Sequence, residues 1–281
     1  MPHSDSTATV VSGWRAELAL TLAPRHGRTV MTECRHLGPL RLQRPFYPEG
    51  QVPHLYLLHP PGGVVGGDEL SIDVNVRSGA HALITTPAAG KFYRSGGPRA
   101  ALMQRIALEA DACLEWLPQE TIVYDGARAD ALTRVDLAGN AQFIGWEMLC
   151  LGRPASNEVF LRGDLRQRFE IWREGEPIWL ERARFDGGVP ALQAAWGLRG
   201  HTLTATLVAV GRIDGLVEQV RTAVDIGADE AFSVTQLDDV LVCRYLGARA
   251  QRARDCLSQA WAVLRPALLN RAACAPRVWN T

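Results

Sequence analysis

The 281-residue chain has no excess charge of either sign, because its 30 basic side chains are balanced by 30 acidic ones. A protein that binds nucleic acid or an anionic membrane surface needs basic residues in excess to neutralise phosphates. The sequence also has no run approaching the roughly 18 apolar residues of a membrane-spanning helix. We therefore expect neither a nucleic-acid partner nor membrane association.

Paired cysteines and a secretion signal are missing as well. The six cysteines are scattered and form no C-x-x-C pair, so the sequence has no signature of a structural zinc site or a redox motif. Cys150 lies among apolar neighbours, which is typical of reduced core cysteines. The first residues lack the basic start and apolar stretch of a signal peptide. We expect residues 1–13 to be a flexible N-terminus and the protein to be cytoplasmic.

Signatures of catalysis and of nucleotide binding are also absent. The glycine-rich segment His59–Asp68 has no following Gly-Lys-Ser/Thr, and it leads into an alternating strand rather than a helix, so it matches neither a P-loop nor a dinucleotide fingerprint. Lys91, the only lysine, has no neighbouring base, and no G-x-S-x-G occurs. The sequence predicts no enzymatic activity and no tightly bound cofactor. The glycine pairs instead indicate tight turns or a close approach of backbone segments.

What the chain has in abundance is short alternating strands. Segments such as Arg15–Leu22, Glu69–Val76 and Leu102–Leu108 place apolar side chains at every second position, which is typical of a strand with one buried face. Many short strands separated by turn signals predict a sandwich, a barrel or a solenoid for residues 14–200. Residues 201–281 instead predict a strand–helix–strand–strand–helix flank, with helices over Arg212–Val224 and Ala250–Leu269. We find no linker between them and expect a single domain over residues 14–281.

Five carboxylates stand in unusual places. Asp68 follows two glycine pairs, Glu115 and Glu120 bracket Trp116–Gln119, and Glu147 and Glu181 lie within or beside apolar strands. Burying an unpaired carboxylate is costly, so each needs an arginine, a proton, a cation or water. One interpretation is a set of ordinary ion pairs with the many arginines. The other is a polar path for a divalent cation, lined by Asp68, Glu147 and Glu181, with Glu120 as a weaker fourth member.

The histidines do not add an obvious metal site. His54 and His59 are five residues apart on an expected strand, so alternation points them to opposite faces. Structural, hydrogen-bonded histidines are the simpler interpretation.

Several motifs in a fixed order make the chain resemble a known family. They are Gly38–Leu40 with Gln43–Pro48, then Leu57–Asp68, Thr86–Ser95, Leu114–Ile122, Cys150–Pro154 and the closing Pro276–Trp279. Together they span nearly the whole sequence, and in this order they resemble the urease accessory proteins UreD, called UreH in some organisms. Gly90 departs from the family pattern, in which many relatives carry Ser or Thr before the lysine.

The resemblance implies a mainly β fold with a strand-wound, β-helix-like body and late helices. It implies a non-enzymatic maturation factor that binds apo-urease, recruits UreF and through it the GTPase UreG, and assists nickel delivery. A homodimer within the accessory complex is part of this expectation. Nickel would then be a transient cargo, and the carboxylates at Asp68, Glu120, Glu147 and Glu181 would line its path.

A different class of function also fits part of the pattern. A strand-wound hydrolase or lyase acting on carbohydrates needs two carboxylates and aromatic side chains that grip sugars. Glu147 and Glu181 could form the acid–base pair, and the tryptophans keep this alternative open: Trp116, Trp146, Trp172, Trp179 and Trp196. The ordered motifs favour the maturation factor.

Overall fold

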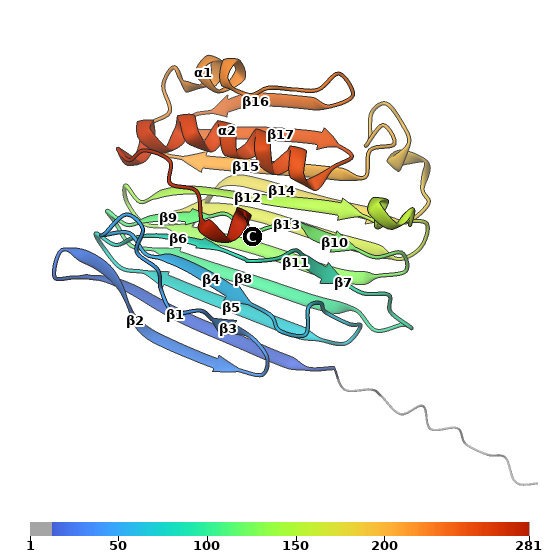
Figure 1. Ribbon diagram of the computed structural model, residues 1–281, viewed down its shortest axis with the longest axis horizontal. Helices are drawn as coiled ribbons and strands as arrows, with labels where there is room; N and C mark the ends of the chain where they lie inside the picture. The colour runs from blue at the N-terminus through green and yellow to red at the C-terminus, as the bar shows by residue number, and fades with distance from the viewer. Residues whose placement is uncertain (1–12, 281) are drawn as a thin grey trace, which may run out of the picture.

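Two stacked β-sheets form the body of the computed structural model, which describes residues 13–280 (Figure 1). The seven-stranded sheet runs, in spatial order, through β14 (Glu176–Asp186), β13 (Asp164–Arg173), β11 (Arg128–Leu137), β8 (Ala100–Leu108), β5 (Glu69–Val76), β1 (Arg15–Arg25) and β2 (Arg28–Leu37). The ten-stranded sheet runs through β16 (Ala231–Leu237), β17 (Val240–Gly247), β15 (Leu203–Val210), β12 (Gln142–Leu151), β9 (Cys113–Trp116), β6 (His81–Thr85), β4 (His54–Leu58) and β3 (Arg41–Leu42). Two short strands lie off this path: β10 (Thr121–Val123) pairs with β12, and β7 (Gly90–Phe92) pairs with β10.

The chain winds between the sheets as a solenoid. From β5 to β13 it alternates between the seven-stranded and the ten-stranded sheet, so the strands that it adds to each sheet over this stretch are parallel: β5, β8, β11 and β13 in the first, and β6, β9 and β12 in the second. Ile72 pairs with Gln104 and Gln104 pairs with Thr133, so successive coils take 32 and 29 residues. Tight turns connect the sheets on one side, and longer segments carrying β7 and β10 connect them on the other. The β-helix-like body is therefore confirmed.

Two apolar cores follow from the alternation within the strands. In β12, Phe143, Leu149 and Leu151 face the seven-stranded sheet, whereas Ile144 and Trp146 belong to the core on the other side. The second core lies beneath α1 (Leu216–Ala223) and α2 (Ala250–Leu269). The long helix packs across β12, β15 and β17 on the outer face of the ten-stranded sheet (Figure 1). The strands that α2 covers are therefore largely buried on both faces, with Arg244 on β17 as an exposed exception.

The C-terminal flank has the predicted order of elements. The second helix has the expected bounds, and Pro266 lies inside its last turn rather than ending it. The first helix is shorter than predicted because Gly215, with a φ of 72°, precedes its first turn. The flank also continues the body, since β15 pairs antiparallel with β12. Three short 3-10 helices complete the fold: Pro154–Ser156, Pro190–Leu192 and Arg277–Asn280.

The expected flexible N-terminus, residues 1–13, lies outside the described residues except for Gly13. Between residues 13 and 280, neither helix has the length and apolarity needed to cross a bilayer.

Candidate functional site

A cavity of about 310 Å³ lies between the two sheets of the solenoid. Most of its wall is apolar and comes from both sheets and from the loops on the side of β7 and β10. Polar side chains interrupt this wall. Gln104 on β8, Thr133 on β11 and Glu147 on β12 come from inside the body, and the loop side adds His59, Thr86, Lys91, Gln119 and Thr121. An ionisable carboxyl group in such surroundings calls for a specific explanation.

Glu147 reaches the cavity because of the strand alternation. It takes an inward-facing position of β12, between Gly145 and Leu149, where its neighbours two residues away are apolar or lack a side chain. Its carboxyl group bonds with the Thr133 hydroxyl and accepts a hydrogen bond from the Gln167 amide. No arginine pairs with it among the described residues, so the ion-pair interpretation does not hold for Glu147. Burial raises the pKa of Glu147 to about 7, against the opposing effect of these hydrogen bonds.

The hydrogen bonds around Thr133 fit a protonated Glu147. The Thr133 hydroxyl also lies 2.7 Å from Oε1 of Gln104. A hydroxyl has one proton to donate, so it cannot donate to Gln104 and to Glu147 at once. With Glu147 protonated, the carboxyl group can donate to Thr133, which then donates to Gln104. A proton on Glu147 therefore gives each group in this series of hydrogen bonds a partner without a counter-ion.

Glu181 lies close enough to Glu147 for its negative charge to act on the Glu147 carboxyl group. Its charge contributes to the raised pKa of Glu147. Glu181 Oε1 accepts a hydrogen bond from the Thr206 hydroxyl at 3.2 Å and lies 3.5 Å from a guanidinium nitrogen of Arg244. Its Oε2 is buried and has no partner among the described residues. Burial raises the pKa of Glu181, although Arg244 and Thr206 oppose the rise.

These side chains form a polar row that crosses the apolar interior. Glu147, Thr206 and Arg244 are in direct register on β12, β15 and β17, and Gln104 and Thr133 are in register on β8 and β11. At one end the row opens into the cavity. At the other end the Arg244 guanidinium, half exposed, lies over the Trp179 ring at 5.6 Å. We define the polar row as Gln104, Thr133, Glu147, Gln167, Glu181 and Thr206.

The other two predicted carboxylates lie beside the cavity and not in the row. Asp68 comes just before β5, as expected, and it is buried. Its two carboxylate oxygens accept hydrogen bonds from the backbone amides of Trp14 and Val65, at 2.8 and 3.0 Å. Its charge also acts on the pKa of His59, which lines the cavity. Asp68 thus orders the glycine-rich turn at the loop side of the cavity.

Glu120 lies between two residues that line the cavity, Gln119 and Thr121, but is not itself part of the wall. Its backbone carbonyl accepts a hydrogen bond from Gly90 at 2.9 Å, which joins the β7 and β10 segments. The Glu120 charge adds to burial in raising the pKa of Cys150 to about 11. The structure brings Glu147 and Glu181 together and leaves Asp68 and Glu120 at the loop side.

The sequence analysis missed four members of the polar row: Gln104, Thr133, Gln167 and Thr206. Each occupies a position in an alternating strand whose neighbours two residues away face the core, as do Leu102 and Ile106 around Gln104. A polar residue in the inward phase of a strand is the signal that could have found them.

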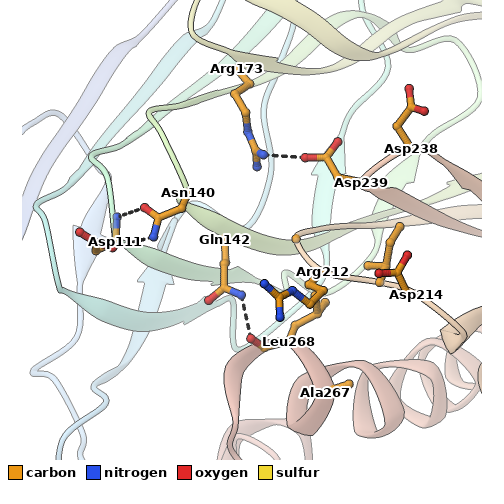
Figure 2. A pocket seen from close by; sticks show the side chains of 12 residues that line it. Asp111, Asn140, Gln142, Arg173, Arg212, Asp214, Asp238, Asp239, Ala267 and Leu268 are labelled. Carbon is orange, nitrogen blue, oxygen red and sulfur yellow. Dashed lines mark hydrogen bonds and ion pairs between the residues drawn. The ribbon is translucent and has the colours of Figure 1, made fainter.

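A second, larger cavity of about 820 Å³ lies at the turns on the opposite side of the solenoid. Figure 2 shows Arg173 paired with Asp239, at 2.5 Å, and Gln142 donating to the carbonyl of Leu268. The wall is mixed in charge, with Arg212, Asp214 and Asp238 also lining it. It shares no residue with the polar row.

Comparison with known proteins identifies the family. A family model described as UreD urease accessory protein matches residues 15–280. The chain belongs to the UreD family. A protein named urease accessory protein UreD from Alcanivorax borkumensis is 47% identical over 275 residues, covering 96% of this chain and 93% of the relative. Proteins of the same name from Azoarcus sp. (48% over 271 residues, 96% and 95% covered) and Citrobacter koseri (41% over 288 residues, 100% and 99% covered) are also similar.

Membership of the UreD family supports a role in urease maturation and favours the accessory protein over the carbohydrate-active alternative. Two of the tryptophans that kept that alternative open, Trp116 and Trp146, are buried in the cores and are not available to a sugar. Trp196 is exposed, but it lies on the loop after β14.

Proposed function

We propose that this protein is a cytoplasmic, non-catalytic scaffold for urease maturation that passes nickel along its polar row. In this proposal it binds apo-urease and a UreF-type partner, with a UreG-type GTPase joining through UreF, and two copies pair within the complex. The observation that carries the proposal is the polar row itself. Six polar side chains cross an interior that is otherwise apolar, although apolar residues would stabilise the same fold better.

The chemistry of the row suits a cation that must be released. Amide, hydroxyl and carboxylate oxygens are weak ligands for nickel compared with imidazole and thiolate, so they would hold the ion transiently. Glu147 supplies a proton that an arriving cation can displace, because its pKa lies near 7. Glu181 supplies a buried oxygen, Oε2, to which no described residue bonds. The nickel ion would thus replace the proton on the carboxyl group, so that no carboxylate in the core is left without a positive partner.

Asp68 and Glu120 belong to the proposal as residues at the loop side. Their charges lie next to cavity residues His59 and Gln119, where they would attract a divalent cation towards the cavity. We propose that the ion enters near these residues and leaves towards Arg244. The half-exposed guanidinium would then have to move from Glu181 for the ion to pass.

The test is co-expression of urease, this protein and its UreF- and UreG-type partners, followed by measurement of complex yield and urease-bound nickel in the same preparations. We expect Glu147→Gln and Glu181→Ala to lower nickel content at unchanged complex yield. Glu176→Ala is the matched control, since Glu176 is an exposed carboxylate on the same strand as Glu181. Normal nickel content in both row variants would overturn the proposed path. Loss of complexes together with nickel would assign these residues a structural role instead.

A further inference from the structure

A second group of metal-ligating side chains lies apart from the polar row. Glu49, His54 and Cys274 each place one ligand atom within 4.8 Å of those of the other two. His54 begins β4, Glu49 lies in the loop before it, and Cys274 lies in the segment that follows α2. The C-terminal segment returns to the ten-stranded sheet, and this brings Cys274 close to His54, which lies 220 positions earlier in the sequence.

One nitrogen of His54 and the carboxylate of Glu49 already face each other at this point. His54 Nε2 is 2.9 Å from Oε1 of Glu49, and its Nδ1 has no hydrogen-bond partner among the described residues although the side chain is fully buried. Arg265 also bonds to Oε1 of Glu49, at 2.7 Å, so both bonds to this carboxylate end on the same oxygen. Among the described residues no hydrogen bond or ion pair to the second oxygen, Oε2, is found, so this oxygen would bind the ion. The two nitrogens of an imidazole point in nearly opposite directions, so Nδ1 faces away from Glu49, and Nε2 is the nitrogen that would bind an ion, in exchange for its bond to Glu49.

The net charge around these three side chains would favour a bound cation. Arg265 forms ion pairs with Glu49 and Glu115, so one positive group faces two negative ones. Burial lowers the pKa of His54, which keeps the imidazole in the neutral form that binds metals. His81 bonds to Oε1 of Glu115 at 2.8 Å. With Cys274 as a thiolate, Glu49, Glu115 and Arg265 leave two net negative charges, which a divalent ion would neutralise.

We propose that Glu49, His54 and Cys274 bind one divalent transition-metal ion of borderline softness. One carboxylate, one imidazole and one thiolate form a mixed donor set suited to zinc, nickel and cobalt and poorly suited to calcium or magnesium. Three protein ligands leave a fourth position for water. The metal would join the C-terminal segment to β4, and it would release the thiol proton of Cys274 on binding.

The site is independent of the proposed nickel path and can be tested separately. The probe is cobalt(II) added to the purified full-length chain, because a cobalt–thiolate bond gives a charge-transfer absorption. We expect one equivalent of cobalt to produce this band, and Cys274→Ser to abolish it. Cys34→Ser is the matched control, since Cys34 is an exposed cysteine on β2. Glu147→Gln should also keep the band, which separates this site from the polar row.

A second measurement tests whether metal binding stabilises the folded protein. Zinc or nickel should raise the thermal midpoint of the wild-type protein and not that of Cys274→Ser. His54→Gln, which retains a donor for Glu49, should weaken cobalt binding at least about tenfold. No cobalt–thiolate band in the wild-type protein would overturn the proposal, and so would an equal band in Cys274→Ser. Unchanged cobalt affinity in a folded His54→Gln protein would overturn it as well.

Discussion

Arg265 on α2 and Glu115 on β9 form an ion pair from which water is excluded, with 2.9 Å between Nε and Oε2 and no exposed surface on either side chain. They are 150 residues apart in the sequence. Glu115 also accepts hydrogen bonds from the indole of Trp261, at 2.6 Å, and from His81, at 2.8 Å. The pair therefore sets where the long helix lies on the ten-stranded sheet.

Breaking this pair should be strongly destabilising. Glu115→Gln leaves the buried guanidinium of Arg265 with only one of its two counter-charges, Glu49, and we expect a loss of about 3 kcal/mol or more in the free energy of unfolding. Urea denaturation measures this loss. Glu17→Gln is the control, because Glu17 pairs with Arg15 on the surface, and it should change stability by less than about 1 kcal/mol. Equal effects of the two variants would contradict the assigned role.

Glu147 should make the stability of the protein depend on pH. The unfolded carboxyl group loses its proton near its ordinary pKa of about 4.5, whereas the native group keeps it until about pH 7. The native state thus binds more protons between these values, and the free energy of unfolding falls as pH rises through this window, by up to about 3 kcal/mol. Below the window and above it the contribution is constant.

Glu147→Gln removes this titration while keeping a hydrogen-bonding group beside Thr133. We expect the variant to gain stability over the wild-type protein between pH 5 and pH 7, with no further gain above that range. Urea midpoints at pH 5, 6, 7 and 8 for both proteins give the difference, in which all shared titrations cancel. A difference that does not change with pH would contradict the raised pKa of Glu147.

The second glycine pair of His59–Asp68 should tolerate no side chain. A Cβ on Gly66 would lie 2.2 Å from the Ser95 hydroxyl and 2.7 Å from the carbonyl oxygen of Pro98. Gly66→Ala should therefore cost about 1–3 kcal/mol through overpacking. Gly96→Ala is the control, because a Cβ there meets nothing within 4 Å. Thermal midpoints of the two variants check the prediction, and equal midpoints would refute it.

Trp279 should hold the C-terminal segment in place. Its ring lies 5.5 Å from that of Trp146 and 6.0 Å from that of Trp261, and its indole donates to Thr85 at 2.9 Å. We expect Trp279→Ala to cost about 2 kcal/mol or more, and Trp279→Phe about 1 kcal/mol for the lost hydrogen bond. Trp196→Ala, at a ring that is 81% exposed, should leave the urea midpoint nearly unchanged. A larger loss in Trp196→Ala than in Trp279→Ala would be the contrary result.

Local patterns in the sequence were sufficient to predict the elements of this fold. The alternation in Glu69–Val76 predicted β5 with its bounds, and the apolar positions of Ala250–Leu269 predicted α2. The glycine pairs predicted a close approach of backbone, which Gly66 makes. Glu147 could be singled out because a carboxylate in an apolar strand is rare. These features depend on residues near one another in the chain, and the ordered motifs were enough to indicate the family.

The partners of each side chain depended on the tertiary structure. The period of a strand decides which face a residue takes, but the register between coils decides which residues meet, and the coils of this solenoid differ in length. Glu147 therefore bonds with Thr133 and Gln167 rather than with an arginine, whereas Glu115 receives its arginine from 150 residues away. The sequence alone determined that these carboxylates need partners, because burial of a charge is costly, and only the winding of the chain decided which partners they have.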